Sequence, residues 1–177
     1  LAGMGNGSFA GHVDTKLNFY PEDVAAGDLD GDGKPDLAVS QSQKVTVLLN
    51  QAGGTFGSGT DYATTAAGYT KVVMADMNGD LKLDVVASGE YPGSVTVLAG
   101  RGDGTLEWTA EYTAMPRPRT LAVADVNADS VPDVITGSWQ DGYVGVRLGR
   151  GDGTLWNHVE YWAGGPVSAV AVADFNL

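Results

Sequence analysis

The chain of 177 residues is long enough for one domain with a sizeable core, and its formal net charge of -12 argues against nucleic acid and anionic membranes as partners. Cysteine is absent, which excludes disulfides, thiolate metal sites and a cysteine nucleophile. No apolar run approaches the length of a membrane span, so we expect no membrane insertion.

Short strands and tight turns alternate along the whole chain. Residues 1–9 end a predicted strand and enter a glycine-rich turn, which recurs at 50–56, 100–106 and 149–155. Polar strands that contain aromatic residues follow the later turns, at 60–63, 109–113 and 158–162. Apolar strands that end at an acidic segment come next, at 24–27, 72–75, 121–124 and 170–173. Two more strands follow each acidic segment, at 37–40 and 45–49, 85–88 and 95–98, and 134–137 and 144–148. With 26 glycines and no helical period, the chain is predicted to be all-β.

The acidic segment is the most regular feature of the sequence. Residues 28–36 read DLDGDGKPD, with Asp at the first, third, fifth and ninth positions. The same offsets recur at 76–84 and 125–133, and the first Asp residues of successive copies are 48, 49 and 49 residues apart. Asp174 and Asn176 begin a fourth copy. This period predicts three complete repeats, near 1–47, 48–97 and 98–146, and a partial one at 147–177.

Carboxylates this close together repel one another unless a cation lies between them. Calcium takes about six to eight oxygen ligands in flexible geometry, and the side chains of positions 1, 3, 5 and 9 with the carbonyl of position 7 can supply them. An EF-hand is excluded, because position 12 is Val39, Ala87 or Thr136 instead of Glu. A solvated Asp-rich turn is the alternative, but three copies at matched offsets favour three calcium ions. The predicted ligands are Asp28, Asp30, Asp32, Lys34, Asp36, Asp76, Asn78, Asp80, Lys82, Asp84, Asp125, Asn127, Asp129, Val131 and Asp133.

Four-stranded antiparallel units at a period of about 49 residues are typical of β-propeller blades, whereas calcium-binding β-solenoids have much shorter repeats. Because successive strands alternate in direction, the acidic segments and the glycine-rich turns are expected on one face, with the opposite face free for a partner. The residue before each acidic segment is small (Gly27, Ala75 or Ala124), which indicates crowding. Tyrosines at matched offsets are expected to pack between blades: Tyr62, Tyr112 and Tyr161.

The acidic segment, the apolar strand after it and the Gly-Asp-Gly-Thr-Leu turn resemble the FG-GAP or VCBS-type repeats of integrin-α-like propellers over the whole chain. The resemblance implies a ring of about seven blades in which these segments ligate calcium. Three complete units would then be a fragment of a longer polypeptide, or would close a ring by association. Leu81 and Ser130 replace Gly33 at position 6, which bears on the tightness of those two turns. The first segment has the most carboxylates and is expected to bind calcium most tightly.

A second group of aromatic and basic residues falls in connections on the face away from the acidic segments. An exposed aromatic side chain there could stack on a sugar or anchor a protein, although it could equally cap the end of a blade. The residues of this candidate ligand face are Tyr20, Tyr69, Tyr91, Trp139, Arg117 and Arg119.

Three other motifs are interpreted structurally. Arg-Gly-Asp occurs at 101–103 and 150–152, where a turn favours Gly and Asp in any case. His12 and His158 lie in separate repeats with no serine or aspartate arrangement that would make a catalytic triad. Pairs of Asp could act in glycoside chemistry, but their recurrence in every repeat favours structure, so we expect no enzymatic activity in this segment.

These features predict a calcium-stabilised propeller segment that serves as a binding or adhesion module, with a protein or glycan ligand, in a secreted or cell-surface protein. Two alternatives stay open. The segment could belong to a polysaccharide-active enzyme such as a propeller-type lyase, or copies of it could self-assemble into a closed ring.

Overall fold

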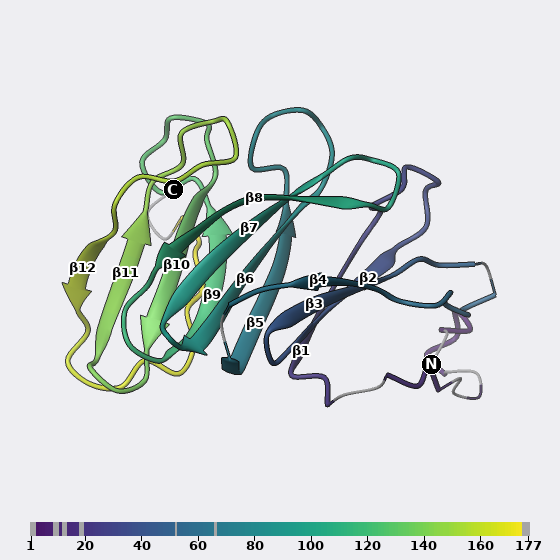
Figure 1. Ribbon diagram of the computed structural model, residues 1–177, viewed down its shortest axis with the longest axis horizontal. Helices are drawn as coiled ribbons and strands as arrows, with labels where there is room; N and C mark the ends of the chain where they lie inside the picture. The colour runs from purple at the N-terminus through teal and green to yellow at the C-terminus, as the bar shows by residue number, and fades with distance from the viewer. Residues whose placement is uncertain are drawn as a thin grey trace.

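The computed structural model describes residues 3–8, 11, 14–17, 20–51, 53–65 and 67–174, and its regular elements there are all strands. No helix in these ranges has the length and apolarity to cross a membrane. The strands form three antiparallel four-stranded sheets, and strands that are consecutive in sequence are adjacent in each sheet. The three sheets lie next to one another in chain order (Figure 1). The predicted all-β class is therefore confirmed.

Each sheet spans one sequence period, counted from the apolar strand before an acidic segment, so its fourth strand lies beyond the repeat bounds predicted above. The first consists of β1 (Asp23–Gly27), β2 (Asp36–Gln41), β3 (Lys44–Leu48) and β4 (Thr60–Ala63). The second consists of β5 (Ala67–Ala75), β6 (Asp84–Tyr91), β7 (Ser94–Gly100) and β8 (Leu106–Thr113). The third consists of β9 (Pro118–Ala124), β10 (Asp133–Ser138), β11 (Tyr143–Arg147) and β12 (Val159–Trp162).

Several strands begin earlier than the sequence pattern predicts, among them β5, β8 and β9, which starts at Pro118 against a predicted 121. β5 starts at Ala67, before the predicted apolar run at 72–75, because an irregularity between Ala67 and Thr70 carries the pairing with β6 further. β8 starts at Leu106 because a shift between Val97 and Leu98 lets it pair with the end of β7.

Apolar β-branched residues on the middle strands explain why the sheets stack. The first core lies between the first and second sheets and contains Leu29, Ala38, Val45, Val47, Val72, Val85, Ala87, Leu98 and Leu106. The second lies between the second and third sheets and contains Met77, Val86, Val95, Val97, Leu121, Val134 and Leu155. Successive residues of a strand point to opposite faces, so Val85 serves one core and Val86 the other.

Alternating strand direction places the connections on two opposite sides of the molecule. The acidic loops (28–36, 76–84 and 125–133) and the glycine-rich turns form the loop face, which is uppermost for the second and third sheets in Figure 1. The β2–β3, β6–β7 and β10–β11 hairpins, with the connections that precede β5 and β9, form the hairpin face on the other side.

The predicted crowding before the acidic loop is confirmed at Gly27. A Cβ atom there would lie 2.5 Å from Leu83 Cδ1 and 2.9 Å from Met74 Sδ, so the second sheet leaves no room for a side chain.

Candidate functional site

The first Asp of each acidic loop organises the loop backbone. Asp28 Oδ1 accepts a hydrogen bond from the N–H of Gly31 at 2.7 Å, and Asp28 Oδ2 accepts one from the N–H of Gly33 at 2.9 Å. The same pair of contacts recurs in the other loops: Gly79 and Leu81 donate to Asp76, and Ala128 and Ser130 donate to Asp125. In the third loop the N–H of Ser130 lowers the pKa of Asp125. Each loop is therefore folded around one carboxylate.

The Asp at position 9 of each loop is buried, and its hydrogen bonds connect the loop to its own sheet. Oδ2 of Asp36 accepts from the N–H of Leu29 at 2.9 Å, and Oδ1 accepts from the N–H of Asn50 at 2.8 Å. Asp84 accepts in the same way from the N–H groups of Met77 and Gly100. Asp133 accepts from those of Val126 and Gly149. All three Asp residues are fully buried. Burial raises the pKa of Asp84. The sequence pattern identified this carboxylate only as a metal ligand and missed its role as a backbone acceptor.

Three carboxylates of the first loop converge. One ligating oxygen from each of Asp28, Asp30 and Asp36 lies within 4.8 Å of the others. Because all three donors are hard oxygens, this cluster fits a hard cation such as calcium. Asp32 stands outside the group and contacts the ammonium of Lys34, whose hydrogen bond lowers the pKa of Asp32.

The fifth residue of the other loops has a local partner as well. Lys82 Nζ lies 3.5 Å from Asp80 Oδ2 in the second loop. In the third loop Asn127 Nδ2 donates to Asp129 Oδ2 at 2.8 Å.

Asn78 occupies the third position of the second loop, where its Oδ1 accepts from the N–H of Asp80 at 3.0 Å. The N–H of Val131 donates to Asp129 Oδ1 at 2.8 Å, as the N–H of position 7 does in every loop.

Replacing the glycine at position 6 does not loosen the turn. Leu81 and Ser130 adopt the left-handed conformation with φ of 65° and 67°, close to the 81° of Gly33. Their N–H groups lie 2.8 Å from the first Asp, against 2.9 Å for Gly33. The side chains are therefore held in a backbone region that favours glycine.

The acidic loops and the repeated tyrosines both join one sheet to the next. Leu29 and Met77, at position 2 of their loops, are buried in the two cores between sheets. The Leu29 carbonyl also accepts from the N–H of Gly104 in the second sheet at 3.0 Å. The hydroxyls of the tyrosines accept across the same boundaries, at 3.0 Å from the N–H of Leu106 to Tyr62 and at 2.9 Å from the N–H of Leu155 to Tyr112. The predicted packing between units is thus confirmed for these two, while Tyr161 is 57% exposed.

The candidate ligand face gathers around a residue that sequence reasoning missed. Glu90 is 3% exposed, and its Oε1 lies 3.7 Å from Arg117 Nε and 3.5 Å from Arg119 Nη2. Arg117 lies 5.3 Å from the ring centre of Tyr91, and Arg119 lies 5.1 Å from that of Trp139. The structure therefore brings together four of the six residues predicted for this face. No pattern in the sequence marks Glu90.

Two other residues were predicted for this face, Tyr20 and Tyr69. Tyr20 is 93% exposed. The side chain of Tyr69, and all of His12 and Asn176, lie outside the described residues.

A comparison with models of protein families identifies the repeats. The model for the FG-GAP-like repeat matches residues 28–87 and 76–136, and both matches begin at the first Asp of an acidic loop. The chain belongs to the FG-GAP-like repeat family. A search of curated proteins finds no match.

A search of solved structures finds chains with a similar fold. An Agrocybe aegerita lectin, described as specifically recognising non-reducing terminal N-acetylglucosamine, matches 80% of this chain with 22% identity and a TM-score of 0.54. The chain spans 38% of the length of that lectin chain. The Tc holotoxin pore of Photorhabdus luminescens matches 78% of this chain and 7% of its own length, with 18% identity and a TM-score of 0.46. The lectin match supports the β-propeller fold that the repeats predict.

The Arg-Gly-Asp motifs lie in glycine-rich turns of the second and third FG-GAP-like repeats. Asp103 Oδ1 accepts from the N–H of Thr105 at 3.0 Å, and the Thr105 hydroxyl is the main cause that lowers the pKa of Asp103. Asp152 and Thr154 repeat this arrangement. Arg101 Nη2 contacts Glu107 Oε2 at 2.9 Å. Both Asp residues close their own turns, as the structural interpretation of these motifs predicts.

Proposed function

We propose that this FG-GAP-like segment is a calcium-binding β-propeller module whose loop face holds one calcium ion per complete repeat. The observation that carries the proposal is the first acidic loop, where Asp28, Asp30 and Asp36 converge within 4.8 Å. The second and third loops share its hydrogen-bond skeleton and offer Asn in place of Asp at position 3. Calcium accepts such mixed oxygen sets, whereas magnesium demands a nearly ideal octahedron.

Calcium would stabilise the segment because it binds only the folded loops. A cation at the cluster removes the repulsion between the converging carboxylates of Asp28, Asp30 and Asp36. The residue after Asp28 is buried in the core between sheets, so ordering the loop also supports the packing of one sheet on the next.

Secretion or display on a cell surface forms part of the proposal. Loops with only three or four carboxylates are expected to bind calcium with modest affinity, which suits the millimolar calcium outside cells. The segment would act there by binding a protein or a glycan, without catalysis, and its hairpin face would make the contact through Tyr91, Trp139, Arg117 and Arg119. The lectin that shares the fold supports the glycan option in general terms.

Isothermal titration with calcium chloride tests the metal sites directly. We expect binding of about three ions per chain, and the variant Asp28→Asn should remove the tightest site, since it takes a charge from the loop with the most carboxylates. Asp103→Asn is the matched control, because this exposed Asp lies on the same face outside the acidic loops. An absence of binding at millimolar calcium would refute the proposal.

A further inference from the structure

Three cavities occupy equivalent positions in the three repeats. Each cavity is lined by an acidic residue of the fourth strand of its sheet, and this residue occupies the same position in all three sheets. It pairs with a residue of the third strand: Asp61 with Thr46, Glu111 with Thr96, and Glu160 with Gly145. A second shared position on the third strand also lines each cavity, and it is occupied by Lys44, Ser94 and Tyr143. The cavity volumes are about 130, 310 and 160 Å³.

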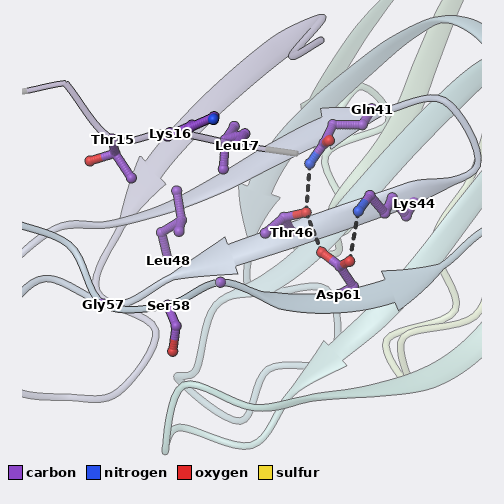
Figure 2. A pocket seen from close by; sticks show the side chains of 11 residues that line it. Thr15, Lys16, Leu17, Gln41, Lys44, Thr46, Leu48, Gly57, Ser58 and Asp61 are labelled. Atoms are coloured by element: carbon purple, nitrogen blue, oxygen red, sulfur yellow. Dashed lines mark hydrogen bonds and ion pairs between the residues drawn. The ribbon is translucent and has the colours of Figure 1, made fainter. Parts of the chain in front are cut away.

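The first cavity has a connected polar wall. Gln41 Nε2 donates to Thr46 Oγ1 at 2.6 Å, and Thr46 donates to Asp61 Oδ1 at 2.6 Å (Figure 2). Lys44 Nζ lies 2.6 Å from Asp61 Oδ2, and this contact lowers the pKa of Asp61, which keeps the carboxylate ionised. The segment from Thr15 to Leu17 lines the other side of the cavity.

Two of the cavities contain a buried polar atom without a partner among the described residues. Gln41 is 2% exposed, and its Oε1 has no hydrogen-bond partner among the described residues. Ser94 is 3% exposed, and its Oγ likewise has no partner there. Turning the Gln41 amide over leaves its nitrogen unpaired instead, so the deficit does not depend on that assignment. Burying a polar group without a partner destabilises the fold, and an outside donor or acceptor would remove that destabilisation.

We propose that each of these cavities binds one neutral sugar ring of a glycan. Hydroxyl groups suit the site because they donate to carboxylates such as Asp61 and also accept from a hydroxyl such as that of Ser94. Volumes near or below the lower end of the roughly 300–1,000 Å³ range typical of ligand pockets limit each cavity to a single small ring. The proposal rests on the proposed binding function, commits to a glycan as the ligand, and places the sugar ring in these cavities instead of at Tyr91 and Trp139.

Charge favours a neutral ring over an ionic ligand. Lys16 and Lys44 line the first cavity and disfavour a cation there, while Asp141 and Glu160 line the third and disfavour an anion. A polyhydroxyl ring meets neither penalty in any of the three cavities. Tyr143 also lines the third cavity, where an aromatic ring can pack on the apolar face of a sugar.

One cavity per repeat implies multivalent binding. A single ring in a small open cavity is held weakly, but several such sites on one molecule increase binding to a sugar-coated surface by about 10²–10⁴-fold without any new contact.

NMR titration of the calcium-loaded chain separates the ligand classes. The probes are glucose, galactose and mannose, together with glucosamine and glucuronic acid, which place a positive or a negative charge on the same ring. We expect at least one neutral hexose to shift the amide signals around Asp61, Ser94 and Tyr143 at millimolar concentration, with smaller shifts from the charged rings. The proposal would be overturned if no neutral hexose caused shifts, if only a charged ring did, or if the shifts were confined to Tyr91 and Trp139.

A variant with all three acids neutralised, Asp61→Asn with Glu111→Gln and Glu160→Gln, tests the sites in a second way. Its retention on beads coated with the active hexose should fall at least tenfold, while Glu107→Gln, an exposed residue of β8 beside Arg101, should bind like the unchanged chain. Equal retention of the triple variant would refute the role of the cavities. The variant Asp28→Asn should bind less calcium yet keep its hexose shifts. An unchanged chain that binds no calcium but still shows these shifts would refute only the metal proposal.

Discussion

At the residue scale, the loops depend on backbone conformations that most side chains avoid. Ala128 and Ser130 both have positive φ in the third loop, as Leu81 does in the second, whereas the first loop uses Gly31 and Gly33 at these positions. The left-handed conformation costs a residue with a side chain about 1–2 kcal/mol. The hydrogen bonds to Asp76 and Asp125 hold that strain in place.

Leu81→Gly should therefore stabilise the chain. Relief of the left-handed strain outweighs the greater flexibility of glycine in the unfolded chain, and Leu81 is 93% exposed, so we expect a net gain of about 0.5–1 kcal/mol. Urea unfolding at fixed calcium concentration measures the change. Gly33→Ala is the reverse control and should destabilise by a similar amount; a loss of stability in Leu81→Gly would contradict this account.

The convergence of acidic side chains in the first loop could be predicted from sequence, but the second role of its ninth residue could not. Asp at positions 1, 3, 5 and 9 predicts convergence, and the structure brings Asp28, Asp30 and Asp36 together. Spacing carries no information about where a carboxylate oxygen finds an N–H group. The contacts of Asp36 with the N–H groups of Leu29 and Asn50 become apparent only when β2 and β3 are placed.

At the element scale, consecutive sheets are joined by individual hydrogen bonds between residues of the two sheets as well as by apolar packing. The hydroxyls of Tyr62 and Tyr112 each accept from a backbone N–H in the following sheet. Tyr161 occupies the same offset in the third sheet and is exposed. The three tyrosines thus form a matched series.

Tyr62→Phe and Tyr112→Phe should each destabilise the fold by about 1–2 kcal/mol, because removal of the hydroxyl leaves a partly buried N–H without an acceptor. Tyr161→Phe should change the free energy of unfolding by less than about 0.5 kcal/mol. Denaturant unfolding of the three variants side by side decides the matter. Equal effects in all three would show that these hydroxyls do not join the sheets.

The pairing of β3 with β4 should weaken in acid through Asp61. Hydrogen bonds from Lys44 and Thr46 lower the pKa of Asp61 in the folded chain. A lowered pKa contributes stability that is present above the ordinary value of 3.8 and is lost as the pH falls through the folded-state value. The effect is modest because the Asp61 side chain is 54% exposed.

Thermal unfolding of the unchanged chain and of Asp61→Asn should therefore differ most near neutral pH. The difference in midpoint should shrink below about pH 4 and should also shrink in high salt. Comparing the two chains cancels the acid response of the loops, which both share. A difference that stayed constant down to about pH 2 would contradict the assignment.

The positions of β1 to β12 were predictable because the strand pattern repeats, whereas strand ends were not, and the strand expected at 170–173 is not formed. β5 and β8 extend beyond their apolar cores through the irregularities at Ala67–Thr70 and Val97–Leu98. Such extensions depend on the partner strand, and the polar residues at 68–71 and 107–109 give no periodic signal of them.

At the scale of the whole molecule, the two faces differ in chemistry. The loop face carries the Asp residues of the acidic loops, while on the hairpin face Glu90 pairs with the guanidinium groups of Arg117 and Arg119. The alternation of strand direction predicts this separation from sequence alone. The cavities at Asp61, Glu111 and Glu160 could not be predicted from sequence, because a lone acidic residue on an outer strand looks like an ordinary solvent-exposed residue.

The central claim is that calcium in the acidic loops stabilises the stack of sheets, and thermal unfolding with millimolar calcium against excess chelator tests it most directly. Binding at three sites should raise the midpoint in calcium by at least about 5 °C, and magnesium at the same concentration should not reproduce the shift. A midpoint that is the same in calcium and in chelator would contradict the account.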